Sequence, residues 1–283
     1  MFTKYIDFEN FDRKKGTNLI KKRLEKLFKE DNCIIRSLGS NYENNFSKKL
    51  IAKLKRFKDI IIIGMGGSIL GSKAIYNFLN KKTKKKFTFI DNLLNDQFYL
   101  KNKKKLNLII SKSGNTLETI SNVNLIIKRS DKNLFITGRK ESNLINLAKK
   151  LKSEVIHHND FIGGRYSVLS EVGMLPAELM GFKYNKFKRL NNLIKNKNFL
   201  ESLVINVSNT INLVNRKRYN SIILNYDEKS LDLFNWYQQL IAESLGKKGK
   251  GILPVVSLLP RDNHSLMQLY LDGIKNNFYT FFF

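Results

Sequence analysis

Residues 59–68 have the sequence Asp-Ile-Ile-Ile-Ile-Gly-Met-Gly-Gly-Ser, and this stretch sets the architecture that we expect for the chain. Its four consecutive isoleucines form a continuous β-branched apolar run, which is typical of a strand buried on both faces. A glycine-rich turn follows at once, and a helix is expected from there to about Asn80. A strand of this kind belongs in a parallel sheet that helices cover on both sides.

The alternation of strand and helix continues along the chain. Apolar runs predict further strands at residues 87–90, 106–110, 133–136 and 155–156. Helices are predicted between them, near residues 115–129 and 141–151. Strands that alternate with helices imply a doubly wound, mainly parallel sheet. The predicted fold class is therefore α/β.

A second unit of the same kind is predicted after a helical stretch over residues 171–215. New strands are expected at residues 221–224 and 255–258, around a helix over residues 231–245, and a last strand at residues 277–283. The last three residues are phenylalanines, which would be an aggregation hazard on an exposed sheet edge. We therefore expect the second sheet to be unfinished and the chain to be incomplete.

Three parts are expected in sequence order. Residues 1–50 form an N-terminal helical segment, because leucines recur there at helical spacing among lysines. Residues 51–182 form the first α/β domain. Residues 183–283 form a helical connection and a partial second domain of the same type.

The composition excludes several classes of protein. A chain of 283 residues, 42% of them hydrophobic, can bury about three quarters of its unfolded surface, which excludes disorder for most of its length. One cysteine, Cys33, cannot form an internal disulfide, a zinc ribbon or an iron–sulfur site. No apolar run approaches the roughly 18 residues that span a bilayer, and residues 1–10 include acidic side chains where a secretory signal needs apolar ones. We predict a soluble, cytoplasmic protein with no membrane partner.

The net charge raises the question of a nucleic-acid partner. The chain has 51 Lys and Arg against 24 Asp and Glu, which gives +27. The densest lysine runs, at residues 81–86 and 101–105, contain little Arg and no interleaved aromatic residues for base stacking. Lys and Asn are abundant along the whole chain rather than in one patch. A solvated basic surface is therefore favoured over nucleic-acid binding, although such a field also attracts a small anionic substrate.

The glycine-rich turn after the first predicted strand is the first candidate binding site. Gly66, Gly67 and Ser68 stand where glycines permit positive φ and close approach of a ligand, and the following helix offers free N–H groups to an anion. The third glycine of a dinucleotide fingerprint would stand earlier than Gly71, and no Gly-Lys-Ser/Thr follows for a nucleotide P-loop. A tight turn without a ligand is the alternative.

A second candidate follows the strand predicted at residues 106–110. Here the hydroxyls of Ser111, Ser113 and Thr116 stand beside the amine of Lys112 at the start of a predicted helix. Such a group forms a compact phosphate cradle that needs no metal. The alternative is ordinary helix capping, because Asn115 stands three residues before a glutamate, as in a capping box.

An arginine and two histidines follow the strand predicted at residues 155–156. Gly164 and Arg165 place a guanidinium next to a flexible turn, where it can stabilise a developing oxyanion. A surface arginine after a glycine turn is the alternative. For His157 and His158 we expect no role in metal binding, because no further ligand stands at the usual spacing.

The remaining candidates are an acid–base pair. Gln239 and Glu243 lie four residues apart and therefore share one face of the predicted helix over residues 231–245. The negative end of that helix disfavours a charged carboxylate, so Glu243 is expected to accept protons near neutral pH. His264 is expected to begin a helix that ends near Lys275, with Asp262 or Asn263 as its cap. The positive end of that helix favours a neutral imidazole. A solvated glutamate and a capping histidine are the alternatives.

Taken together and in this order, these segments resemble the glucose-6-phosphate isomerase family, the aldose–ketose isomerases of glycolysis and gluconeogenesis. The likeness covers residues 60–273. It lies in Gly66-Gly67-Ser68, Ser111-Lys112-Ser113 with Thr116, Gly163-Gly164-Arg165-Tyr166-Ser167, residues 238–247, and His264-Ser265.

The resemblance implies a fold with two facing sugar isomerase domains, each a Rossmann-like sandwich, and a site between them. The hydroxyls that match Ser111, Ser113 and Thr116 would bind the substrate phosphate, and groups that match residues 66–68 would line the sugar site. Gln239 matches a glutamine that contacts the substrate. The implied substrate is a phosphorylated hexose, a carbohydrate derivative, and no cofactor or metal is implied.

The resemblance also implies a division of catalytic roles. Glu243 would shuttle the proton between C2 and C1, and Arg165 would stabilise the enediolate intermediate. His264 would help to open the sugar ring, and in the family this histidine reaches the site from the neighbouring subunit of a homodimer.

One departure from the family affects the expected activity. The family has a further catalytic lysine on a C-terminal helix beyond the histidine, and this sequence ends at Phe283 before such a helix. We therefore expect the 283-residue chain to isomerise poorly and a longer form to isomerise well. The alternatives are another phosphosugar-binding sugar isomerase-domain protein, such as a regulator or a glucose/mannose phosphate isomerase, and, more distantly, a nucleic-acid-binding protein or a dinucleotide-dependent oxidoreductase.

Overall fold

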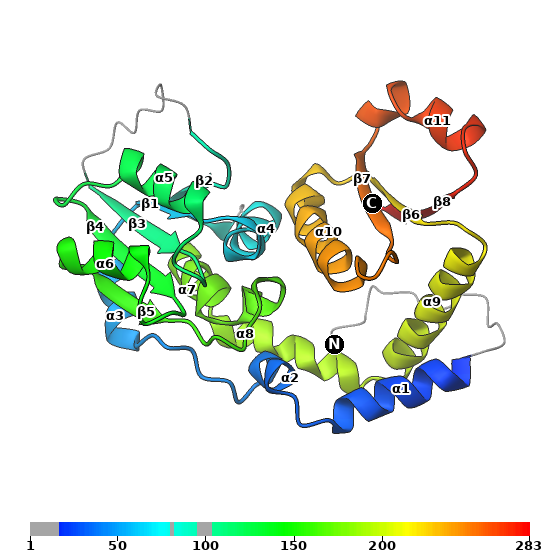
Figure 1. The fold of residues 1–283 in the computed structure, drawn as a ribbon, viewed down its shortest axis with the longest axis horizontal. Coiled ribbons are helices and arrows are strands. Elements are labelled where there is room, and N and C mark those ends of the chain that lie inside the picture. The colour runs from blue at the N-terminus through cyan, green and yellow to red at the C-terminus, as the bar shows by residue number, and fades with distance from the viewer. Residues whose placement is uncertain (1–16, 80–81, 95–103) are drawn as a thin grey trace.

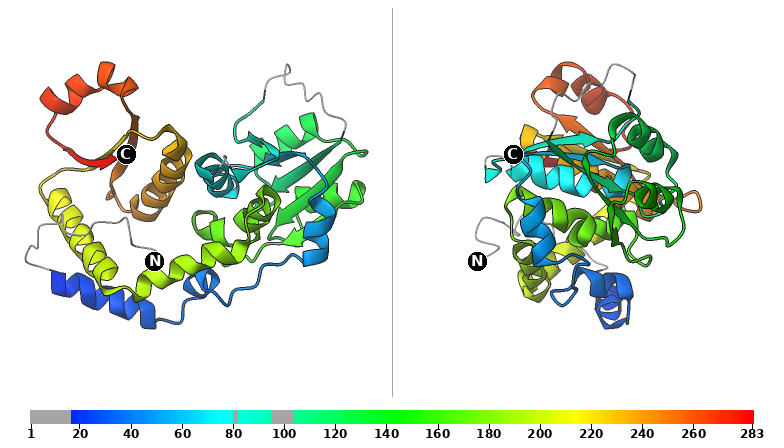
Figure 2. Two further views of the ribbon diagram at one scale, coloured as in Figure 1. Left: turned by 180° about the vertical axis from the view of Figure 1, so that it is seen from behind. Right: turned by 90° about the vertical axis from the view of Figure 1, so that its left-hand side faces the viewer.

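The computed structural model describes residues 17–79, 82–94 and 104–283. Two α/β lobes stand side by side above a base of helices, as Figures 1 and 2 show. The first lobe holds the larger sheet, and the second lobe holds the C-terminus. Helix α4 (Leu70–Leu79) of the first lobe packs against α10 (Leu231–Leu245) of the second. No described helix is long and apolar enough to cross a bilayer.

Five strands form the first sheet in the described part of the chain, and all of them are parallel, in the order β2-β1-β3-β4-β5. Each predicted strand of this sheet is confirmed, with ends that differ by at most one residue. The bounds are β1 (Asp59–Ile63), β2 (Lys86–Ile90), β3 (Lys105–Ile110), β4 (Lys132–Thr137) and β5 (Glu154–His157).

Helices cover both faces of this sheet, so the doubly wound α/β prediction is also confirmed. The four isoleucines of β1 explain why: Ile60 and Ile62 join one hydrophobic cluster, while Ile61 and Ile63 join the other. One face is packed by α3 (Lys48–Leu54), α4 and α7 (Glu171–Met180), and the other by α5 (Leu117–Ile126) and α6 (Asn143–Lys150).

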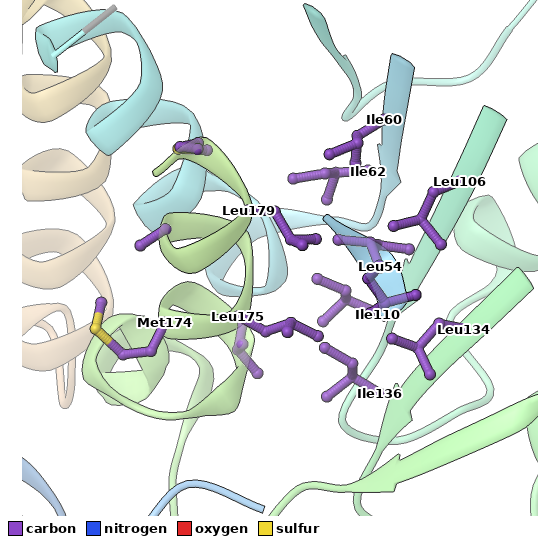
Figure 3. Packing of buried hydrophobic residues seen from close by; sticks show 14 of the residues in the cluster. Leu54, Ile60, Ile62, Leu106, Ile110, Leu134, Ile136, Met174, Leu175 and Leu179 are labelled. Atoms are coloured by element: carbon purple, nitrogen blue, oxygen red, sulfur yellow. The ribbon is translucent and has the colours of Figure 1, made fainter. Parts of the chain in front are cut away.

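The close view in Figure 3 shows the α7 side of this core, where Leu175 and Leu179 point toward the sheet residues Ile60, Ile110 and Ile136. All five side chains are buried, with exposures of 0% or 1%. Burial on both faces leaves the strands little freedom to shift register, because a shift by one residue exchanges the two faces.

Helical segments lead from the first lobe to the second along the base of the molecule (Figure 1). They are α8 (Tyr184–Lys188), the 3₁₀ segment Arg189–Lys195 and the long helix α9 (Lys197–Asn215). The N-terminal helix α1 (Thr17–Lys29) packs against α9 rather than against a sheet. This contact ties the beginning of the described chain to the connection between the lobes.

The second sheet has three described strands, all parallel, in the order β7-β6-β8. Their bounds are β6 (Asn220–Asn225), β7 (Leu253–Leu258) and β8 (Asn277–Phe282). The predicted strands and the helix α10 between β6 and β7 are confirmed. At the edge strand β8, Phe281 is 61% exposed, while Phe282 packs edge-on against Phe234 of α10 with ring centroids 4.9 Å apart.

Two helix predictions need correction. The expected N-terminal helical segment is, in its described part, α1, α2 (Cys33–Leu38) and the start of α3, with a non-helical stretch at residues 39–47; residues 1–16 lie outside the described chain. The helix expected to start at His264 instead starts at Met267 as α11 (Met267–Asp272). His264 is the last residue of a preceding 3₁₀ turn.

Candidate active site

The two loops that the sequence singled out for anion binding meet at one place on the first sheet. The glycine-rich turn follows β1, and the Ser111–Thr116 loop follows β3, which pairs directly with β1. The chain leaves β1 toward β2 on one side and returns to β3 on the other, so the strand order reverses between these loops. Ligands of open α/β sheets bind at such a reversal, outside the carboxyl ends of the strands.

Three hydroxyl groups converge in the loop after β3. The Oγ of Ser111 lies 2.9 Å from the Oγ1 of Thr116, and the Oγ of Ser113 lies 3.3 Å from the same atom. Ser111 and Ser113 also accept hydrogen bonds from the backbone N–H groups of Gly114 and Asn115 at 3.2 Å. The loop therefore holds its hydroxyls in a fixed cluster instead of leaving them to rotate in solvent.

The capping-box alternative for this loop is not formed. The N-cap residue of α5 is Thr116, whose side chain makes no capping hydrogen bond. The side chain of Asn115 instead accepts from the backbone N–H of Asn143, at the start of α6. Because the hydroxyls do not cap α5, the free N–H groups at its first turn and the hydroxyl cluster are both available to an anion.

A pocket of about 260 Å³ opens over this cluster. Its lining includes two charged residues that the sequence analysis did not select, Arg139 and Asp160, which follow β4 and β5. The sequence could have indicated both residues through their position, because each follows a predicted strand and the carboxyl ends of parallel strands lie at the same edge of a sheet. The complete lining is Ser68, Ser111, Lys112, Ser113, Thr116, Arg139 and Asp160.

The glycine turn after β1 is the point of closest approach between three segments. A Cβ on Gly67 would lie 2.2 Å from the carbonyl oxygen of Gly164, so only glycine fits there. Gly66 has φ of +52°, and a Cβ on it would lie 2.9 Å from the amide nitrogen of Gln239 on α10. The hydroxyl of Ser167 donates to the carbonyl of Gly67 at 2.9 Å and locks the turn to the arginine segment.

Glu243 lies at the centre of an arrangement that spans both lobes. Its Oε2 accepts from Nη1 of Arg165 at 2.9 Å, and its Oε1 accepts from Nε2 of Gln239 at 2.7 Å. Arg165 comes from the segment after β5 in the first lobe, whereas Gln239 and Glu243 lie one turn apart on α10. The structure thus brings together the arginine, glutamine and glutamate candidates.

Two polar atoms in this arrangement are buried and make no hydrogen bond within the described chain, namely Nε of Arg165 and Oε1 of Gln239. Buried polar atoms without partners are rare because each one loses its hydration on burial. The donor on the arginine and the acceptor on the glutamine are thus two such exceptions, both on side chains that bind Glu243.

The expectation that Glu243 has a pKa near neutrality is wrong. The hydrogen bond from Gln239 is the main cause that lowers the pKa of this carboxyl; partial burial opposes it, and the Arg165 guanidinium lowers it further. The Glu243 side chain is also 49% exposed, so solvent screens its unfavourable interaction with the negative end of the helix. Glu243 is therefore an ionised carboxylate at neutral pH, which is the form that a base requires.

His264 lies apart from this arrangement within the single chain. It is exposed at the end of the 3₁₀ turn Arg261–His264, and no described hydrogen bond links it to the other candidates. The expected cap residue Asp262 turns inward instead, where it accepts from the backbone N–H of Leu258 at 2.8 Å and the hydroxyl of Ser257 at 3.2 Å. Because that carboxylate organises the loop after β7, no helix begins at His264.

The two histidines after β5 have different surroundings. His157 is exposed, whereas His158 is buried and its Nδ1 lies 2.6 Å from Oε1 of Glu171, the first residue of α7. The other oxygen of Glu171 accepts from the hydroxyl of Tyr42 at 3.0 Å. This network fixes the start of α7 just beyond the arginine segment. Among the described residues, no three His, Cys, Asp or Glu side chains gather as a metal site would require.

Comparison with known proteins shows the family to which this chain belongs. A sequence model described as phosphoglucose isomerase matches residues 46–252, which include both loops, Arg165, Gln239 and Glu243. The chain belongs to the phosphoglucose isomerase family.

Curated relatives of this family are similar over most of the chain. The glucose-6-phosphate isomerase of Methanocaldococcus jannaschii is 34% identical over 98% of this chain and 71% of its own length. That of Mycoplasmopsis pulmonis is 34% identical over 87% of this chain and 64% of its own length. The chain thus spans about two thirds of the relatives that it matches. These names favour the phosphoglucose isomerase family over the alternative of another phosphosugar-binding protein.

Solved structures support the fold. A hypothetical protein of Thermus thermophilus matches with a TM-score of 0.70 and 23% identity, over 94% of this chain and 69% of its own. A glucose-6-phosphate isomerase of Chlamydia trachomatis matches with a TM-score of 0.65 and 22% identity, over 82% of this chain and 51% of its own. Both solved structures therefore share the parallel α/β fold described above.

Proposed function

We propose that this chain carries the aldose–ketose isomerisation that interconverts glucose 6-phosphate and fructose 6-phosphate. Its curated relatives are named glucose-6-phosphate isomerase. The observation that carries the proposal is the position of Glu243, an ionised carboxylate between the Arg165 guanidinium and the Gln239 amide. A base beside a fixed cation is what proton transfer next to a carbonyl requires.

The substrate phosphate is assigned to the hydroxyl cluster of Ser111, Ser113 and Thr116, with Ser68 and Lys112 at the wall of the same pocket. Hydroxyl donors and one lysine suit a phosphate dianion without a metal. Binding energy from this group, which does not react, holds the carbon chain in place for the chemistry. Gly66, Gly67 and Gly164 form the close backbone junction that the sugar would contact.

Proton transfer follows from the charges. In the open-chain aldose, Glu243 removes the proton from C2, the C–H electrons form the C1=C2 bond, and the carbonyl electrons move to O1. Arg165 stabilises the negative charge of this enediolate. Glu243 then returns its proton to C1 while the O2 proton passes to O1 and C2 becomes the carbonyl. One carboxylate serves both carbons, and no electron acceptor is needed.

Ring opening and the homodimer are further parts of the proposal. His264 is exposed and makes no described contact with Glu243 of its own chain. This position is compatible with an imidazole that serves the site of a second subunit, as the resemblance implies.

The test compares the unmodified chain with Glu243→Gln in a coupled assay of fructose 6-phosphate conversion. Turnover should fall roughly 10²–10⁴-fold, the usual contribution of a positioned base, while the affinity for inorganic phosphate stays the same. Glu154→Gln is the matched control, since that glutamate, on β5, pairs with Lys53 and Lys132. Measurable turnover that is equal in the unmodified and Glu243→Gln proteins would reject the proposed base.

A further inference from the structure

A polar cluster around the buried carboxylate of Asp232 joins the two lobes at a distance from the hydroxyls and the base. The Nζ of Lys73, on α4, lies 3.7 Å from Oδ1 of Asp232, on α10, and 2.7 Å from Oδ2 of Asp91, which follows β2. Asn77 of α4 donates to the other oxygen of Asp232. Asn235 of α10 donates to Oδ1 of Asp232 at 3.3 Å. Both oxygens of Asp232 are therefore occupied by named donors.

The burial of Asp232 makes its hydrogen-bond partners necessary. Asp232 is only 9% exposed, and a carboxylate taken out of water is costly unless it is paired and hydrogen-bonded. Apolar contacts between two helices tolerate sliding, because burial of apolar surface has no direction. A buried carboxylate whose donors lie at fixed positions on the opposite helix does not tolerate sliding, because it would lose those donors. Fixing the register of paired helices is the best-attested role of such buried polar groups.

The polar cluster and the proposed base lie on one face of α10. Asp232 and Gln239 are seven residues apart, two helical turns or about 10.5 Å, and Glu243 follows one turn later. On the other side, α4 begins at Leu70, just after the Gly66–Ser68 turn that Gln239 contacts. Helix α10 thus approaches the first lobe at Gly66 through Gln239, near the site, and at Lys73 of α4 through Asp232, further away.

We infer that the Lys73–Asp232 ion pair is a positioning device, which fixes the register of α10 on α4 and so holds Gln239 and Glu243 against Gly66 and opposite Arg165. The inference rests on the proposed function. Sliding α10 by one residue, about 1.5 Å, would break the 2.9 Å contact between Glu243 and Arg165. Lys73 and Asp232 touch no reacting atom and act through the helices that carry the groups that do.

The test separates placement of the base from anchoring of the phosphate. Two ligands are titrated by calorimetry: inorganic phosphate, and a sugar-acid phosphate whose carboxylate imitates the enediolate. For Asp232→Asn the affinity for the sugar-acid phosphate should fall roughly tenfold to a hundredfold, as expected for a displacement near 1 Å, while the affinity for inorganic phosphate stays within about twofold. Lys73→Gln, which changes the other helix, should give the same split, and Lys73→Arg should keep both affinities.

Asp131→Asn is the matched control. It removes a more deeply buried pair, Lys105–Asp131 at 3.6 Å with both side chains 7% exposed, within the first lobe. This variant should melt at a lower temperature and keep both affinities. Equal losses for both ligands in Asp232→Asn, or no loss for either, would overturn the inference alone. An unmodified chain that does not prefer the sugar-acid phosphate to inorganic phosphate would overturn the proposed function, and the inference with it.

Discussion

Replacing Gly67 by alanine should disable the site by moving Arg165. The new Cβ would lie 2.2 Å from the carbonyl oxygen of Gly164, 2.3 Å from its carbon and 2.7 Å from its Cα. Ordinary contact begins at 3.4 Å, so the two backbones must separate by about 1.2 Å. Neither is a flexible side-chain end that can turn away. Gly164 is bonded directly to Arg165, so the guanidinium moves with it.

The expected size of the effect has two parts. A displacement near 1 Å typically costs about 10²-fold in the chemical step, and overpacking costs about 1–3 kcal/mol of unfolding free energy. The separation also stretches the hydrogen bond from Ser167 to Gly67, now 2.9 Å. The pocket proposed for the phosphate should be less affected, because the hydroxyls of Ser111 and Thr116 belong to a different loop.

The assay measures thermal unfolding, fructose 6-phosphate turnover and affinity for the sugar-acid phosphate. Gly163→Ala is the matched control: its φ is −66°, and its Cβ would approach nothing closer than 3.7 Å, the Tyr166 ring. We expect Gly67→Ala to lose turnover and sugar-acid affinity, and Gly163→Ala to lose little of either. Wild-type values for both in a folded Gly67→Ala protein would refute the argument that this junction holds Arg165.

Two further predictions concern carboxylates. The hydrogen bond from Gln239 is the first cause that lowers the pKa of Glu243, so the carboxylate persists to lower pH, and kcat/KM should fall only as the pH drops through that lowered pKa. In Gln239→Leu the acidic limb of the kcat/KM profile should move to higher pH. An acidic limb that stays in place would contradict the assignment of Glu243 as the base. Burial raises the pKa of Glu171, but the hydrogen bond with His158 and others leave it lowered, so its stabilisation is present at neutral pH and lost on acidification. Glu171→Gln should cost about 1–3 kcal/mol in urea unfolding at neutral pH and less in acid, and a cost independent of pH would count against the pairing.

The sheets could be predicted from the sequence because their strands carry their own signal. Ile60 to Ile63 alternate between two cores, so every position is apolar, and a continuous β-branched run has few other interpretations. The serine-rich loop was also visible, because its three hydroxyls lie within six residues of one another and need no distant partner.

The errors arose where side-chain hydrogen bonds or the packing of the sheet, which a local pattern of residue types does not reveal, decide the outcome. The helix dipole indicated a raised pKa for Glu243, but the hydrogen bond from Gln239, one turn earlier on the same helix, lowers this pKa first, and the Arg165 guanidinium on the other lobe lowers it further. Asp262 looked like a helix cap, yet the loop after β7 uses its carboxylate internally. Arg139 and Asp160 each stand alone in the sequence, and only the parallel order of β4 and β5 brings them to one pocket.

The division of the site between the lobes has a thermodynamic consequence. Every residue that lines the pocket proposed for the phosphate lies in the range from Ser68 to Asp160, whereas the proposed base belongs to α10. A sugar phosphate anchored on the first lobe with its carbons at Glu243 would bridge the two lobes. Since a ligand stabilises the state that binds it, such a substrate strengthens the docking on which its own conversion depends.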